Sequence, residues 1–442
     1  MRRTGCLLAL VLWSGVAHAA VSWAPMHPTS VVQASGDPLG PDGAALALST
    51  ETSGPSGSGA ITSLDATAFR GREVELSGML EVTQGVGAAA LWLRADGPGG
   101  RLAFSSTGGR PVTLQNGAQP RTLQLYIPTS ATHLKFGITL QAPGALRASA
   151  VRLKTLDAAP DTGSAYTLLD TAISTIRAHA LNTGQVDWAT QSRRLTPALK
   201  DAPPQEAHAH IDAVLEALGD RHSALLPRRV AADYRADAVA TQPIEAHARD
   251  DVGYVRVPGV RGSDRGAGRV FSTALCQAIE SHSAAASSGW IVDLRGNGGG
   301  AMWPMLAGLR PLLGDVHIGA FKDRAGASSA WKPRPIDACS ADLARSPVAV
   351  LVGPGTASSG EAVAIAFKGR VTTRFFGQTT AGLATSNQTF PLPDGSVLML
   401  TTAVFADRAG QAYPDGVPPE VPVETAQDAI DIAADWLKSQ RR

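Results

Sequence analysis

The sequence predicts two main parts, an all-β sandwich followed by an α/β domain, with a small helical region between them. Three observations support this prediction. Apolar and polar residues alternate with a period of two over residues 69–156, and helical periodicity replaces that pattern over 165–232. From residue 252 onward, apolar strands alternate with amphipathic helices. At 442 residues the chain is also too long for one hydrophobic core.

Residues 20–156 are expected to form a β-sandwich, of jelly-roll type, because short alternating segments recur with Gly, Pro and Asn turns between them. The segments are EVELSGMLEV, AALWLRAD, RLAFSS, RTLQLYI, HLKFGITLQ and ASAVRLKTL. Residues 20–60 are rich in Ser, Gly, Pro and Ala, and we expect irregular structure there. An exposed Trp92 would suit a carbohydrate-binding module, whereas many sandwich domains only support a neighbouring domain.

A linker, DAAPDTGS at 157–164, is expected to lead into a helical region at 165–232. Two segments there, AYTLLDTAISTIRAHAL and EAHAHIDAVLEAL, carry apolar residues at three- and four-residue steps. The segment between them, VDWATQSRRLTPALK, predicts a further helix that begins near Asp187.

An α/β core is predicted for residues 252–442. Nearly continuous apolar strands separated by amphipathic helices are typical of a sheet covered on both faces. The expected strands are VGYVRV, GWIVDLRG, PVAVLVG, TTRFFG and SVLMLTTAVF. The expected helices are GRVFSTALCQAIESHSA, AMWPMLAGLRPLL, GEAVAIAFKG and AQDAIDIAADWLKSQ.

Residues 1–19 are typical of a secretory signal peptide. Arg2 and Arg3 precede an apolar stretch, and Ala17-His18-Ala19 supplies the small residues of a cleavage site. The apolar stretch is too short to span a bilayer, so no stable membrane insertion is expected. The sequence therefore predicts an exported protein, either periplasmic or extracellular.

Composition indicates neither nucleic-acid binding nor a metal. The 39 basic and 38 acidic residues give a formal charge of +1, without the basic footprint that nucleic acid requires. His208 and His210 would point about 200° apart on a helix, so they do not form a metal site. No cofactor is expected. Cys276 and Cys339 could form a disulfide in an oxidising compartment or remain separate thiols.

Two strand ends carry the candidate chemistry, since sites in α/β sheets form where strands end at their carboxyl side. The first is IVDLRGNGGG, in which glycines let a backbone approach a ligand beside a helix N-terminus. The second is GPGTASSGE at 353–361, where two serines stand between a strand and a helix. A serine so placed is either a nucleophile or an ordinary helix cap.

These segments occur in an order that resembles the tail-specific (C-terminal processing) and tricorn-core serine peptidases of family S41. LGDRHSALL, DLRGNGGG, TASSGE, GQTTAGLATSNQTFPLPDG and GVPPEVPV carry the resemblance, which covers roughly residues 165–425. It implies a ClpP/crotonase-like spiral sheet for the core. It also implies hydrolysis of peptide bonds in a protein or peptide substrate through an acyl-enzyme.

The same resemblance implies roles for individual residues. Ser358 falls on the nucleophile, while the backbone N–H of Ser359 and that of Gly299 or Gly300 would form an oxyanion hole. Glu361 would then be structural, supporting the turn or its helix.

The general base expected in this chain differs from the one used by the tail-specific branch of the family. The tail-specific branch uses a lysine where this chain has Leu383, and leucine cannot accept a proton. The tricorn-like branch uses a histidine that matches His222, which can act as a base and then an acid near neutral pH.

A group to orient the imidazole is not settled by the sequence. Asp415 is the nearest acid to the position expected from the family, which holds Tyr413, and Asn387 lies where the lysine-using branch has a helper amide. Asp220 and Ser223 flank His222 as further candidates.

The PDZ domain that is usual in the family is not expected, because the segment between Pro227 and Val252 is too short for it. Two other functions stay open. One is a non-catalytic S41-fold protein that binds an apolar ligand or a peptide, and the other is a carbohydrate-binding protein that acts through the sandwich.

Overall fold

The computed structural model describes most of the chain. The described residues are 21–51, 58–85, 87–109, 111–114, 117–141, 143–157, 163–235, 239–240, 242–262, 264–332, 336 and 339–440. The predicted signal peptide at 1–19 and most of the predicted linker lie outside them. The chain divides into two compact units, Met1–Asp161 and Thr162–Arg442.

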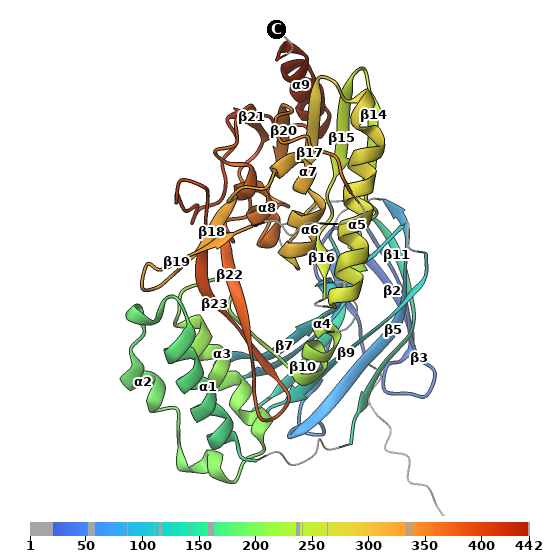
Figure 1. The fold of residues 1–442 in the computed structure, drawn as a ribbon. Helices are drawn as coiled ribbons and strands as arrows, with labels where there is room; N and C mark the ends of the chain where they lie inside the picture. The colour runs from blue at the N-terminus through green and yellow to red at the C-terminus, as the bar shows by residue number, and fades with distance from the viewer. Residues whose placement is uncertain are drawn as a thin grey trace, which may run out of the picture. The chain divides into compact units, whose positions relative to one another are not determined.

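The first unit contains two antiparallel sheets (Figure 1). One has the order β1-β4-β10-β6-β7, with β8 also paired to β6, and the other has the order β2-β3-β11-β5-β9. The bounds in the first sheet are β1 (Ala24–Pro25), β4 (Ser58–Asp65), β10 (His133–Leu140), β6 (Ala88–Gly97), β7 (Gly100–Ser106) and β8 (Val112–Thr113). Those in the second are β2 (Ser30–Asp37), β3 (Gly43–Thr50), β11 (Gly144–Thr155), β5 (Arg72–Gly85) and β9 (Gln119–Ile127).

One core joins the two sheets of this unit. Leu46 and Leu76 from one sheet share a buried cluster with Leu91 and Phe136 from the other. Residues that alternate along each strand turn inward, as in sandwich domains generally.

Two expectations for this unit are wrong. Residues 20–60 contain β2, β3 and part of β4 rather than irregular structure. In β3 buried and exposed positions alternate, but alanines and serines occupy many of them, so the hydrophobic pattern is weak. Trp92 is only 7% exposed. It is paired with Gly137, where a Cβ atom would lie 3.0 Å from the indole Nε1, so the missing side chain makes room for the ring.

The second unit is built on a sheet with the order β14-β15-β17-β20-β21-β24. All neighbours from β15 to β24 are parallel, and β14 is antiparallel to β15. The bounds are β14 (Glu245–Arg249), β15 (Val252–Arg256), β17 (Gly289–Asp293), β20 (Val348–Val352), β21 (Thr373–Gly377) and β24 (Val421–Pro422). Because β17, β20 and β21 are parallel neighbours, the loops that follow them leave the same edge of the sheet.

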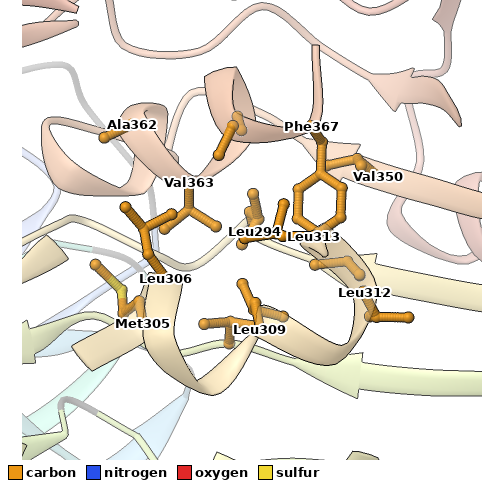
Figure 2. Packing of buried hydrophobic residues seen from close by; sticks show 14 of the residues in the cluster. Leu294, Met305, Leu306, Leu309, Leu312, Leu313, Val350, Ala362, Val363 and Phe367 are labelled. Atoms are coloured by element: carbon orange, nitrogen blue, oxygen red, sulfur yellow. The ribbon is translucent and has the colours of Figure 1, made fainter. Parts of the chain in front are cut away.

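Helices cover both faces of this sheet, as the alternation of strands and helices predicted. Side chains of α5, α6, α7 and α8 pack with one face, and α9 packs on the other. The bounds are α5 (Arg265–His282), α6 (Met302–Gly308), α7 (Arg310–Leu313), α8 (Ser359–Phe367) and α9 (Ala426–Ser439). All residues of α8 are buried. Figure 2 shows Val363 and Phe367 of α8 directed at leucines of α6 and α7.

A second, antiparallel sheet in this unit has the order β12-β23-β18-β19, with β22 paired to β23. The bounds are β12 (Ala224–Leu226), β23 (Val397–Ala406), β18 (Gly319–Asp323), β19 (Ser328–Trp331) and β22 (Thr385–Pro391). A short pair, β13 (Val239–Ala240) with β16 (Val260–Arg261), precedes α5.

Helices near the start of the unit pack against the β22–β23 hairpin (Figure 1). Leu168 of α1 and Ile211 of α3 share a buried cluster with Leu398 and Leu400 of β23. The helix bounds are α1 (Ala165–His179), α2 (Trp188–Ser192), α3 (His208–Glu216) and α4 (Arg228–Arg235). Short 3₁₀ helices follow or join them at Thr183–Gln185, Pro197–Lys200 and Pro204–Ala207.

Cys276 of α5 and Cys339 form a disulfide, which resolves the choice that the sequence left open. Their Cα atoms are 6.1 Å apart, within the normal range. The next residue, Ser340, donates to the Glu280 carboxylate through both its N–H and its hydroxyl. Within the described part of the chain, no helix is both long enough and apolar enough to cross a membrane.

Candidate functional site

Ser358 occupies a strained turn between β20 and α8. Its backbone has φ +52° and ψ −122°, a conformation that residues with a side chain rarely adopt. The side chain is half-buried, at the N-cap of α8. Strain of this kind is found where a fold holds a functional side chain in a set position.

Glu361 holds this turn. Its carboxylate is completely buried and accepts a hydrogen bond of 2.9 Å from the backbone N–H of Ser358. It also accepts from the Thr380 hydroxyl at 2.6 Å and from the N–H groups of Gly382 and Leu383 at 2.9 and 2.8 Å. Four donors offset the cost of burying a charge. Glu361 therefore ties the Ser358 turn to the segment 380–383.

The glycine-rich loop after β17 packs directly against the serine turn. Gly299 has φ +96°, and a Cβ atom there would lie 2.7 Å from the Ala357 carbonyl oxygen and 2.9 Å from both Ser358 Cβ and Ser359 N. Only a glycine allows this approach. The Ser359 hydroxyl donates to the Gly300 carbonyl oxygen at 2.6 Å, so side chain and backbone together lock the two loops.

The N–H groups at this junction differ in their availability. That of Gly299 donates to Asn297 Oδ1 at 3.0 Å, and Asn297 is fully buried. Among the described residues, the N–H groups of Ser359 and Gly300 have no hydrogen-bond acceptor. Ser359 also stands at the N-terminus of α8, where the helix dipole favours negative charge.

His222 lies in the loop between α3 and β12. Asp220 shapes this loop, since its carboxylate accepts from the N–H groups of His222 and Ser223 and from the Ser223 hydroxyl. The imidazole is half-buried, with Nδ1 2.7 Å from the hydroxyl oxygen of Thr385. Burial lowers the pKa of His222 below its usual value, and the Asp220 charge opposes that change only in part.

The segment 380–385 links the two candidate groups. On one side, the N–H groups of Gly382 and Leu383 bind Glu361, which binds the Ser358 turn. On the other, Thr385 contacts His222, and the Arg221 guanidinium donates to the carbonyl oxygens of Ala381 and Gly382 at 3.2 Å. Ser358 and His222, which are far apart in the sequence, are thus both attached to one short segment.

The candidate orienting groups have other contacts. Asn387 donates at 2.9 Å to the backbone carbonyl of His222 rather than to its ring. Asp415 is exposed and has no hydrogen bond with His222 among the described contacts. Tyr413 donates to Asp407. In the structure, the hydrogen-bond partner of the His222 ring is the hydroxyl of Thr385. The sequence patterns did not single out this residue, although it lies two residues before Asn387 on the same face of β22.

No group of three or more His, Cys, Asp or Glu residues among those described could hold a metal ion. The serine turn and the His222 loop offer a serine hydroxyl, backbone N–H donors and an imidazole. These are the components of nucleophilic acyl transfer.

Comparison with known proteins identifies the class. Residues 251–423 match the model of peptidase family S41, which confirms the resemblance that the sequence motifs predicted. The match includes Gly299, Ser358 and Thr385, whereas His222 precedes it.

Individual relatives cover parts of the chain. This chain is 34% identical over 169 residues to the nisin-resistance protein of Lactococcus lactis subsp. lactis. The similarity covers 35% of this chain and 51% of that protein. This chain is also 30% identical over 154 residues to the carboxy-terminal processing protease CtpA of Bacillus subtilis (strain 168). That similarity covers 34% of this chain and 32% of that protein. The chain thus spans about half the length of the first relative and a third of the second.

A solved structure of a lipoprotein from Streptococcus agalactiae is similar over a larger share. It has a TM-score of 0.56 and 25% identity, and the similarity covers 64% of this chain and 100% of that chain.

Proposed function

We propose that this protein is an exported serine peptidase that hydrolyses peptide bonds through an acyl-enzyme. One observation carries the proposal. Ser358, in its strained turn, lies against the glycine loop, and Glu361 ties that turn to the segment 380–385, which also contacts His222. The match to peptidase family S41 supports the same reaction class and implies a protein or peptide as substrate.

The Ser358 hydroxyl attacks the carbonyl carbon of the scissile bond in this scheme. As the Oγ–C bond forms, the serine proton passes to Nε2 of His222 and the carbonyl π electrons move to oxygen. The imidazolium then protonates the departing amine, and a water activated by the same imidazole releases the acyl group.

Backbone donors stabilise the tetrahedral oxyanion. The Ser359 N–H is one donor, at the positive end of α8. Gly300 is the better second donor, because the Gly299 N–H already binds Asn297. Gly299 instead contributes the close approach that brings the two loops together.

Asn387 and Asp415, the two residues predicted to assist His222, differ in their contacts. Asn387 acts on the backbone of His222, where it accepts a bond from Thr401 and donates to the histidine carbonyl. Asp415 has no described contact on which an orienting role could rest.

Export is supported by the disulfide, since such bonds persist in oxidising compartments. The similar structure from Streptococcus agalactiae is that of a lipoprotein, which agrees with such a location. We therefore propose a periplasmic or extracellular enzyme, with the signal at 1–19 directing its export.

The test is a comparison of the wild-type chain with Ser358→Ala, Ser359→Ala and His222→Ala. Each is treated with a fluorophosphonate probe and an unstructured protein substrate. We expect labelling and cleavage in wild type, neither in Ser358→Ala, and labelling in Ser359→Ala because that change keeps the backbone N–H. A folded wild-type protein that neither labels nor cleaves would favour a non-catalytic binding protein for an apolar ligand or peptide.

A further inference from the structure

We propose that Thr385 is the third member of the catalytic arrangement, a neutral hydroxyl that orients His222 in place of a carboxylate. This inference rests on the proposed function, in which His222 is the base. Thr385 is a positioning residue here, because it acts on the imidazole and not on the substrate.

The contact is short and its two sides are held independently. His222 Nδ1 and Thr385 Oγ1 are 2.7 Å apart. Thr385 begins β22, where it pairs with Val404, and its N–H donates to the Leu383 carbonyl oxygen at 2.7 Å. Leu383 in turn donates to Glu361, so the hydroxyl is positioned by the same carboxylate that holds the Ser358 turn.

The backbone of His222 does not depend on this hydroxyl. Asp220 accepts from its N–H at 2.9 Å, and Asn387 donates to its carbonyl oxygen at 2.9 Å. Loss of the Thr385 hydroxyl would therefore free the ring to rotate without releasing the loop.

The chemistry requires one tautomer. When Nδ1–H donates to the threonine oxygen, Nε2 carries the lone pair that must accept the serine proton. After that transfer both ring nitrogens are protonated, and Nδ1–H still donates to Thr385. The threonine hydroxyl itself gains and loses no proton.

A neutral partner also changes the charge balance around the base. The described ionisable groups near His222 are Asp220, which binds its backbone, the neighbouring Arg221, and Glu361 beyond the amides of Gly382 and Leu383. None of these carboxylates is hydrogen-bonded to the ring. Since burial lowers the pKa of His222, the base should remain unprotonated below the usual histidine range.

The experiment measures kcat and KM against pH for Thr385→Val, Thr385→Ser and Thr385→Asp. Thr389→Val is the matched control, because Thr389 lies on the same face of β22 and is exposed. Valine at 385 should lower kcat by about 10-fold or more with little change in KM, since an ill-oriented base loses much of its contribution. Thr385→Ser should retain most of the wild-type kcat, and the Thr389→Val control should have the same kcat and KM as wild type.

The aspartate variant tests the neutral character of the partner. A carboxylate at Nδ1 should move the acid limb of kcat/KM upward by about one pH unit. The proposal would be overturned if Thr385→Val had the kcat of wild type, or if Thr385→Asp left the acid limb of kcat/KM unmoved. It would also be overturned if Thr385→Ser lost as much activity as Thr385→Val.

A second readout separates this inference from the proposed function. The imidazole of His222 is titrated by ¹⁵N NMR in the Ser358→Ala background, with and without Thr385→Asp. Two results would support the contact even if the wild-type protein proves inactive. The pKa of His222 is higher with Thr385→Asp, and the neutral imidazole carries its proton on Nδ1. A neutral form protonated on Nε2 would refute it even if the enzyme cleaves peptides.

Discussion

Replacement of Gly299 by alanine should damage both the fold of the site and its activity. A Cβ atom there would lie 2.7 Å from the Ala357 carbonyl oxygen and 2.9 Å from Ser358 Cβ and Ser359 N. The backbone atoms among these cannot move aside as the end of a flexible side chain could. The positive φ of +96° adds a conformational cost for any residue with a side chain.

The magnitude follows from these two effects. An unfavourable backbone conformation costs about 1–3 kcal/mol. Forcing an extra carbon into a packed site costs about another 1–3 kcal/mol. The total, about 2–6 kcal/mol, is a large part of the stability of a typical domain. Relief of the overlap would displace Ser358, and a shift of about 1 Å can lower a rate by about 100-fold.

Gly298→Ala is the matched control. Gly298 is the preceding residue, is exposed and is not among the residues of positive φ, and a Cβ atom added there would meet no other atom within 4 Å. Thermal unfolding and peptide cleavage are measured side by side on the two full-length variants. Gly299→Ala should unfold at least about 5 °C lower and lose most of its activity, with Gly298→Ala close to wild type. Equal stability and activity of the two variants would refute the close packing of this loop on the serine turn.

Three further predictions concern other parts of the site and its support. Glu361→Gln should destabilise the protein by about 2 kcal/mol or more and abolish fluorophosphonate labelling, because an amide cannot accept from all four donors; unchanged melting and labelling would contradict this. Reduction or Cys276→Ser should lower stability by about 2–5 kcal/mol but leave cleavage intact at low temperature, and equal melting under oxidising and reducing conditions would argue against the disulfide. The acid limb of kcat/KM should lie below pH 6.5, because burial lowers the pKa of His222 and the active, neutral imidazole persists as pH falls; a limb above 7 would contradict the assignment of this base.

Local patterns in the sequence were sufficient for much of the second unit. The apolar runs of β17 and β20 and the periodicity of α5 and α9 are visible because their side chains pack against a sheet buried on both faces. The β18–β19 hairpin was not predicted, since β19 exposes most of its residues and so has little alternation. β2 and β3 were missed because small residues give alternation little contrast.

The sequence by itself determined the candidate nucleophile, the glycine loop and the absence of a lysine at position 383, because these depend on residue type and local order. Only the tertiary structure decided how they meet. The Gly299 approach to Ser358, the bonds from segment 380–383 to Glu361 and the disulfide join parts of the chain that are not neighbours in sequence. The partner of His222 lies 163 residues away, and no local periodicity encodes a contact at that separation.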